Sequence, residues 1–167
     1  YGQHNSNGSQ AIVRGDIFSS SGGYISDVYR SCYEGIARVN IFLAKLEEFQ
    51  GEGITEEVRN LYRGEAKFIR AFYYYYLYAC YGDVPLVTEP LTLENQAQPK
   101  VEASQVLDLI VGDLDAAIQH LPSQRYQQGG GHLVRSSAQA LKMRVLMFSA
   151  YGADGSPSTS ILQEAKI

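Results

Sequence analysis

The sequence contains no tryptophan, only two cysteines and no long apolar run, and each absence excludes a class of protein. Two cysteines cannot form the disulfide framework of a small secreted protein. The chain also has no C-x-x-C motif, which would have indicated zinc binding or redox chemistry. Without a long apolar run, no membrane-spanning helix is expected. Acidic residues outnumber basic ones by 18 to 14. The net charge of −4 therefore disfavours nucleic acids and anionic membrane surfaces as partners.

Tyrosine dominates the aromatic residues that are present. The 167 residues include 13 tyrosines and six phenylalanines, and 45% of the chain is hydrophobic, which is enough for a core of its own. A tyrosine has a large apolar face and a hydroxyl at its tip. It therefore suits a half-buried helix seam, and equally a polar organic ligand such as a sugar or a peptide. Composition leaves both uses open.

Neither end of the sequence is typical of a natural terminus. The chain starts at Tyr1 without an initiating Met or an apolar leader, and residues 160–167 open a helix that then stops. We therefore expect a fragment of a larger protein. Residues 1–23 are rich in Gly, Ser, Asn and Gln and are expected to form a loop segment, whereas residues 24–167 form an incomplete helical region.

Four segments show the spacing of three and four between apolar residues that is typical of amphipathic helices. They cover residues 26–49, 56–81, 104–121 and 136–152. Thr55 is predicted to cap the second helix and Ser104 the third. Ser136 and Gln139 have the spacing of a capping box at the start of the fourth. Gly82 follows the second helix at a position that favours a left-handed cap.

The order of these helices predicts an all-α fold of two helical hairpins in succession. One helix of each pair carries small and apolar residues against its partner, as in helix-pair repeats that stack on one another. Between the hairpins, residues 86–103 contain Pro90 and Pro99 and are expected to be extended. The second helix is apolar around almost its whole circumference after residue 66, so other parts of the protein must surround it.

No motif of a catalytic, metal or cofactor site is present. The sequence has no zinc-protease, phosphate-loop, nucleophile-elbow or dinucleotide motif, and His4, His120 and His132 lie far apart. Asp113 and Asp115 point to different faces of a helix, so a solvated helix surface explains them better than a catalytic pair.

Other polar and aromatic residues of the second helix have structural interpretations. Glu65 and Arg70 either form a partly buried ion pair or anchor neighbouring loops, and the sequence leaves both options open. The four tyrosines at 73–76 point around a full helical turn, so they cannot form one flat platform and are expected to pack between helices. Cys32 and Cys80 are expected to be buried and too far apart to form a disulfide.

Two consecutive segments carry a family resemblance. Residues 64–74 are GEAKFIRAFYY and residues 81–86 are YGDVPL. Together they resemble the hallmark segment of the SusD/RagB family of outer-membrane nutrient-binding lipoproteins. Three upstream residues, Tyr33, Ile36 and Asn40, fit that family's first-helix pattern. Further matches lie at residues 113–118, Leu121-Pro122 and residues 134–148, so the resemblance extends over about residues 24–167.

The resemblance implies tetratricopeptide-like helix pairs and a binding protein that needs neither catalysis nor a cofactor. It implies a lipoprotein on the outer face of the outer membrane of Bacteroidetes cells, held by a lipidated cysteine that this sequence lacks. Family members hold glycans, or in some branches peptides, for import by a SusC-type TonB-dependent transporter. A helical-repeat scaffold whose only partners are proteins is the alternative. This chain would be about a third of a full member, namely its N-terminal helical part.

The same resemblance indicates where a ligand would bind. Ligand residues vary within the family, but the loop before the first helix can contribute to the ligand site. In that loop, Asn7, Arg14, Asp16 and Tyr24 offer an amide, a guanidinium, a carboxylate and a ring, which suit sugar hydroxyls and stacking. They are the candidate ligand-binding residues. Tyr29 stands where the family often has Trp, and it is expected to keep the packing volume.

Overall fold

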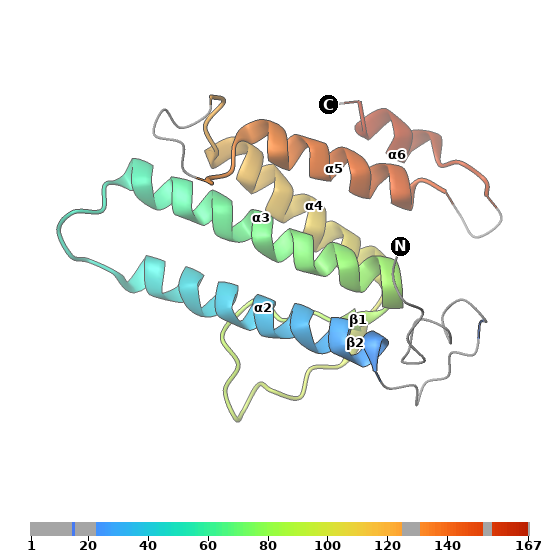
Figure 1. Ribbon diagram of the computed structural model, residues 1–167, viewed down its shortest axis with the longest axis horizontal. Helices are drawn as coiled ribbons and strands as arrows, with labels where there is room; N and C mark the ends of the chain where they lie inside the picture. The colour runs from blue at the N-terminus through green and yellow to red at the C-terminus, as the bar shows by residue number, and fades with distance from the viewer. Residues whose placement is uncertain (1–14, 16–22, 125–130, 152–154, 167) are drawn as a thin grey trace, which may run out of the picture.

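The first two predicted helices form an antiparallel hairpin. The structure is a computed structural model that describes residues 15, 23–124, 131–151 and 155–166. In it, α2 spans Tyr24–Glu48 and α3 spans Glu56–Tyr81, and the two helices lie side by side (Figure 1). The predicted cap at Thr55 is confirmed, because its Oγ1 accepts a hydrogen bond from the backbone N–H of Val58 at 3.3 Å.

The end of α3 is also as predicted. Gly82 has φ 67°, a conformation that only glycine adopts readily, and its N–H donates to the carbonyl of Tyr78 at 3.1 Å. The α2–α3 contact itself depends on another glycine. A Cβ atom added at Gly35 would lie 2.3 Å from Cε2 of Tyr73, so a side chain there would displace that ring.

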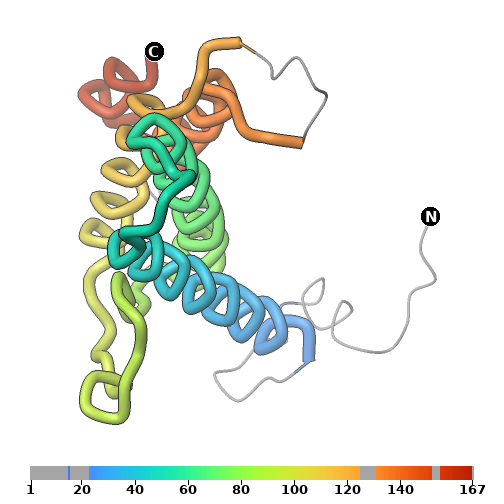
Figure 2. The backbone as a smooth tube through the Cα atoms, turned by 90° about the vertical axis from the view of Figure 1, so that its left-hand side faces the viewer, coloured from blue at the N-terminus to red at the C-terminus, as the bar shows by residue number. Residues whose placement is uncertain are grey.

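A short antiparallel ribbon, which the sequence did not predict, follows α3. Strand β1, Val84–Pro85, pairs with β2, Lys100–Val101, and Val84 lies opposite Val101. Residues 86–99, here called the strap, connect the two strands without regular structure, as expected for this proline-containing segment. The strap extends beyond α2 at the end of the molecule opposite α5 and α6 (Figures 1 and 2).

The second hairpin has the predicted helices but different caps. Helix α4 spans Ala103–His120 and α5 spans Arg135–Ser149. Neither starts with a side-chain cap of its own, so the predictions for Ser104 and for the Ser136–Gln139 box are wrong.

Distant groups satisfy the first amides of these two helices instead. The carboxylate of Asp83 accepts from the N–H of Ala103 at 2.8 Å, and the carbonyl of Pro122 accepts from the N–H of Arg135 at 2.8 Å. A local cap is therefore unnecessary at either helix.

The last helix and the stacking of the pairs agree with the sequence pattern. Helix α6 spans Thr159–Glu164, close to the helix expected after residue 160. The most extensive packing joins the two hairpins through α3 and α4, as expected for stacked helix pairs. The core between the helices is apolar. Its largest fully buried side chains include Tyr74, Ile36, Leu77, Ile110 and Leu114.

One prediction about the cysteines needs correction. Both are free thiols, in agreement with the expectation that they do not pair. Cys32 is buried, and burial raises the pKa of its thiol. Cys80, one residue before the end of α3, is exposed instead of buried. Within the described residues, no helix combines the length and the apolar character needed to cross a membrane.

Candidate functional site

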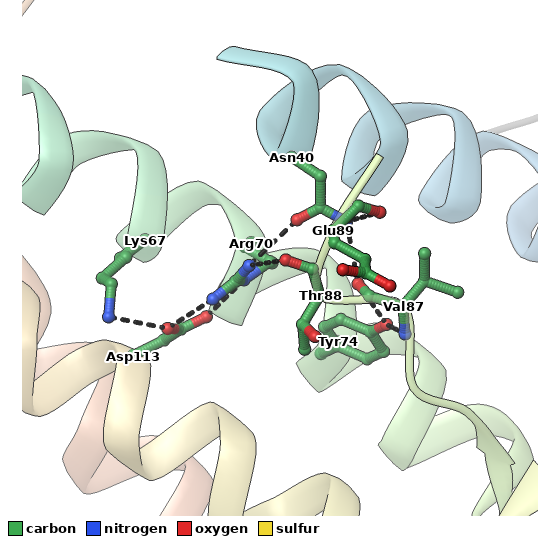
Figure 3. A network of polar contacts seen from close by, with 8 residues as sticks. All are labelled: Asn40, Lys67, Arg70, Tyr74, Val87, Thr88, Glu89 and Asp113. Atoms are coloured by element: carbon green, nitrogen blue, oxygen red, sulfur yellow. Dashed lines mark hydrogen bonds and ion pairs between the residues drawn. The ribbon is translucent and has the colours of Figure 1, made fainter. Parts of the chain in front are cut away.

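A polar network lies buried where α2, α3 and α4 meet (Figure 3). The guanidinium of Arg70 donates two hydrogen bonds to the carboxylate of Asp113, from Nε at 2.7 Å and from Nη2 at 2.9 Å. Its Nη1 donates to the amide oxygen of Asn40 at 2.9 Å. The ammonium of Lys67 lies 3.6 Å from the same carboxylate. This two-point pairing is the strong, directional form of an ion pair.

The network also fixes the beginning of the strap. Nδ2 of Asn40 donates to the carbonyl of Val87 at 2.8 Å, and Nη1 of Arg70 donates to that of Thr88 at 3.1 Å. The hydroxyl of Tyr74 accepts from the N–H of Val87 at 2.7 Å. In β1, the carbonyl of Pro85 accepts from the hydroxyl of Tyr33 at 2.7 Å. Side chains of α2 and α3 therefore satisfy the backbone where it enters the strap.

The role of Asp113 differs from the sequence prediction. Its side chain is only 3% exposed, so a solvated helix surface does not explain it. Asp115 is exposed and pairs with Lys142 at 2.8 Å, which fits the expected surface position. The two carboxylates do point to different faces. The prediction failed for Asp113 because its partner, Arg70, comes from a different helix.

Glu65 and Arg70 both anchor connecting segments, which was the second option, and Arg70 in addition forms the buried ion pair with Asp113. The carboxylate of Glu65 accepts from the N–H of Leu133 at 3.1 Å and lies 2.9 Å from Nδ1 of His132. Thus Glu65 holds the segment before α5, while Arg70 holds the strap.

The tyrosines of α3 differ in burial according to their positions around the helix. Tyr74 is fully buried, and burial raises the pKa of its hydroxyl to about 12. Burial also raises the pKa of Tyr33 on α2. The ring of Tyr74 packs between helices as predicted, with its centroid 6.5 Å from that of Tyr33. Tyr76, in contrast, is 44% exposed, so the packing prediction does not extend to the whole run.

An open groove of about 510 Å³ separates α2 from the strap. We call it the strap groove. Its lining residues on α2 are Tyr29, Arg30, Tyr33, Glu34 and Ala37. The opposite wall consists of Pro85, Val87, Leu91, Gln96 and Gln98. Apolar side chains with a few polar groups are the usual lining of a small-molecule site.

Sequence reasoning missed this groove because its two walls are about sixty positions apart in the chain. One signal did point to it. Asn40 and Arg70 are polar residues inside apolar helical stripes, which indicates a buried network and hence a segment held by it.

A second hollow of about 270 Å³ lies between α2 and α3. Its lining is Arg38, Val39, Phe42, Tyr62, Glu65, Ala66 and Ile69. Glu65 is already engaged with the segment before α5, and the remaining surface is mainly apolar. This hollow offers fewer polar groups to a sugar than the strap groove does.

The structure tests little of the predicted ligand site. Asn7, Arg14 and Asp16 lie outside the described residues. Tyr24 is the first residue of α2 and is 64% exposed, so its ring is accessible. The assignment of these four residues to a ligand site stays a prediction. Among the described residues, no three His, Cys, Asp or Glu side chains are grouped in a way that could hold a metal ion.

Comparison with known proteins identifies a family that this chain matches. The profile of a family of SusD-like proteins, described as starch-binding and associating with the outer membrane, matches residues 2–147. A curated relative, SusD-like protein P25 of Formosa agariphila, is 30% identical over 124 residues. That match covers 74% of this chain but 23% of the relative, so this chain spans less than a quarter of that protein.

Solved structures give the same result. A SusD superfamily protein of Parabacteroides distasonis is 31% identical, with a TM-score of 0.80, and the match covers 97% of this chain and 34% of that one. A laminarin-binding SusD-like protein is 29% identical, with a TM-score of 0.69 and coverage of 83% and 29%. The predicted all-α fold of stacked helix pairs is therefore confirmed.

Proposed function

This chain belongs to the SusD-like family, and from that premise we propose that it is the helical part of a cell-surface protein that binds oligosaccharides. The bound sugar is delivered to a SusC-type TonB-dependent transporter in the outer membrane. The protein is held at the outer face by a lipid anchor outside this sequence. It acts by binding and release, without catalysis.

The family match over residues 2–147 is the observation that carries this proposal. The family description concerns starch binding at the outer membrane, and one relative is described as binding laminarin. Both are polymers of neutral sugars. The side chains are compatible with such ligands. Exposed aromatic rings can stack on the apolar faces of sugars, and polar groups that donate and accept hydrogen bonds can bind sugar hydroxyls.

Titration calorimetry with a panel of neutral oligosaccharides and short peptides tests the ligand class. We expect saturable binding of at least one oligosaccharide. Binding of peptides alone would move the protein to the peptide-binding branch of the family. Binding of neither would contradict the function.

Co-purification from native membranes tests the transporter. A protein that feeds an importer should bring down a large β-barrel partner, whereas a free helical scaffold should bring down other proteins or none. Salt washes of increasing strength serve as the control for adventitious association, because weak charge-dependent contacts are screened.

We also propose that Asn7, Arg14, Asp16 and Tyr24 contribute to the ligand site. Replacement of Tyr24 by Ala should weaken oligosaccharide binding without changing the melting temperature, since the ring is exposed at the start of α2. Leu93, which is exposed on the strap, provides the matched control for loss of an exposed apolar side chain. Equal affinity of Tyr24→Ala and Leu93→Ala would remove Tyr24 from the site.

A further inference from the structure

We infer that the strap groove is a second sugar-binding subsite, distinct from the loop before α2, and that it selects neutral rather than acidic oligosaccharides. The inference rests on the proposed function, because it takes the ligand class from there. Its residues come from α2, β1 and the strap, and none comes from the candidate ligand residues at the start of the chain.

The groove is preformed by the buried network. Val87 is held by Asn40 and Tyr74, and Thr88 by Arg70, through side chains that are themselves buried. Farther along, Asn95 closes a turn, since its Oδ1 accepts from the N–H of Thr92 at 2.6 Å and its Nδ2 donates to the carbonyl of Pro90 at 3.2 Å. Both walls are therefore fixed before a ligand arrives, which lowers the entropy lost on binding.

The α2 wall of the groove suits the apolar face of a sugar ring. The rings of Tyr29 and Tyr33 lie 4.8 Å apart between centroids. Because Tyr33 donates its hydroxyl to Pro85, its polar end is already satisfied. Leu91 is partly exposed at the opposite wall. The volume of about 510 Å³ is within the range of roughly 300–1,000 Å³ that is usual for small-ligand sites.

The rim of the groove offers groups that match hydroxyls. The Nε2 atoms of Gln96 and Gln98 donate to backbone carbonyls of the strap at 3.2 and 2.7 Å, so their amide oxygens remain directed acceptors. Glu34 adds a carboxylate acceptor and Arg30 a cationic donor. A hydroxyl both donates and accepts, so a neutral sugar can use all of these groups.

The charges around the groove argue against an acidic ligand. Arg30 is paired with Asp27 at 2.6 Å, and Glu34 lies beside it on α2. Arg30 and Glu34 are the charged residues that line the groove, and the charge of Arg30 is already balanced by Asp27. Glu34 therefore determines the local charge, and a uronate or sulfated sugar would be repelled.

Calorimetry on the protein and on variants of the groove tests the inference, with maltohexaose, laminarihexaose and an oligogalacturonate as probes. Ala37→Trp places a large side chain in the groove, and Q96A/Q98A removes two exposed rim amides. Gln119→Trp, at an exposed position of α4 outside the groove, is the matched control. We expect neutral-sugar affinity to fall at least tenfold in Ala37→Trp and about fivefold or more in Q96A/Q98A, with no change in Gln119→Trp.

Each result has a distinct meaning. Unchanged affinity in both groove variants, with binding in the parent, overturns the subsite and leaves the proposed function intact. Absence of binding to both neutral probes in the parent counts against the proposed function itself. Preference for the oligogalacturonate, or loss of peptide rather than sugar binding in the variants, also overturns the subsite.

Hydrogen exchange provides a second measurement if Ala37→Trp fails to fold. In the parent protein, saturating neutral oligosaccharide should slow exchange of the amides of residues 86–99. Slowing confined to residues outside the groove would overturn the subsite even if affinity falls in the variants.

Discussion

At the scale of single residues, Arg70 joins three helices and the strap. Its guanidinium contacts Asp113 on α4, Asn40 on α2 and the carbonyl of Thr88. Such a pair is favourable only while both partners are present, because a lone buried charge loses its hydration without compensation. The same side chain therefore supports both the core and the groove wall.

Replacement of Arg70 by Met should destabilise the protein by about 3–5 kcal/mol, since the carboxylate of Asp113 would remain buried with only Lys67 nearby. Urea unfolding measures the change. Arg30→Met is the matched control, because Arg30 pairs with Asp27 at the surface, and its effect should stay within about 0.5 kcal/mol. Equal effects of the two substitutions would contradict a structural role for the buried pair.

The hydroxyl of Tyr74 should also be important for stability. In Tyr74→Phe, the buried N–H of Val87 loses its acceptor, which should lower the free energy of unfolding by about 1–3 kcal/mol. Tyr76→Phe removes the same atom from an exposed ring and should change stability by less than about 0.5 kcal/mol. Thermal and urea unfolding of the two variants distinguish these outcomes. A neutral effect at position 74 would show that the strap is held without this bond.

Tyr74 also predicts how the free energy of unfolding decreases at high pH. The pKa of Tyr74 is raised to about 12 by burial, whereas an unfolded tyrosine titrates near about 10. Between these values the unfolded chain has released a proton that the folded chain keeps, so stability is fully present below about pH 10 and declines as pH rises toward about 12. Burial raises the pKa of Tyr33 as well, which adds to the decline. Urea midpoints measured across this range should fall, and less steeply in Tyr74→Phe.

At the scale of elements, the helices begin in two ways, either with a local side-chain cap or with a group from a distant segment. Helix α3 begins with a local side-chain cap at Thr55, whereas α4 and α5 begin with groups from Asp83 and Pro122. A local cap stabilises its own helix, and a remote cap in addition joins two segments of the chain.

Substitution of the confirmed cap at Thr55 and of the unconfirmed cap at Ser136 should therefore have unequal effects. Thr55→Ala removes the acceptor for the N–H of Val58 and should lower stability by about 1 kcal/mol. Ser136→Ala removes no cap, because α5 has no side-chain cap bond, and should change stability by less than about 0.5 kcal/mol. Chemical denaturation provides the comparison. A larger loss at position 136 would restore the capping-box interpretation.

The elements also show which features a sequence reveals. Helix positions follow from apolar spacing, and the bounds of α3 agree with the prediction to the residue because a cap and a glycine mark its ends. The remote caps and the role of Asp113 were not predictable, since each partner comes from another segment whose position depends on the packing. The strap groove is hidden for the same reason. Tyr24 and the loop before it were singled out by family resemblance alone.

At the scale of the whole molecule, two different surfaces flank the first hairpin. The strap groove lies along one side of α2 and has a polar rim. The outer face of α3 carries Ile69, Phe72 and Tyr76, all exposed, and Phe148 of α5 lies beside it, 6.1 Å from Tyr75 between ring centroids. We call this second surface the α3 stripe. Its exposure agrees with the expectation that an almost uniformly apolar helix needs more neighbours than two hairpins supply.

The α3 stripe predicts how the 167-residue chain behaves when produced by itself. Exposed contiguous apolar surface favours association, so the chain should self-associate in a concentration-dependent way. I69K/Y76K should reduce association, measured by sedimentation velocity, with little loss of stability, because both positions are already exposed. Leu93→Lys, which changes an isolated exposed apolar residue on the strap, is the control and should leave association unchanged. A monomeric parent chain that melts in one cooperative transition would show that two hairpins suffice and that the stripe needs no cover.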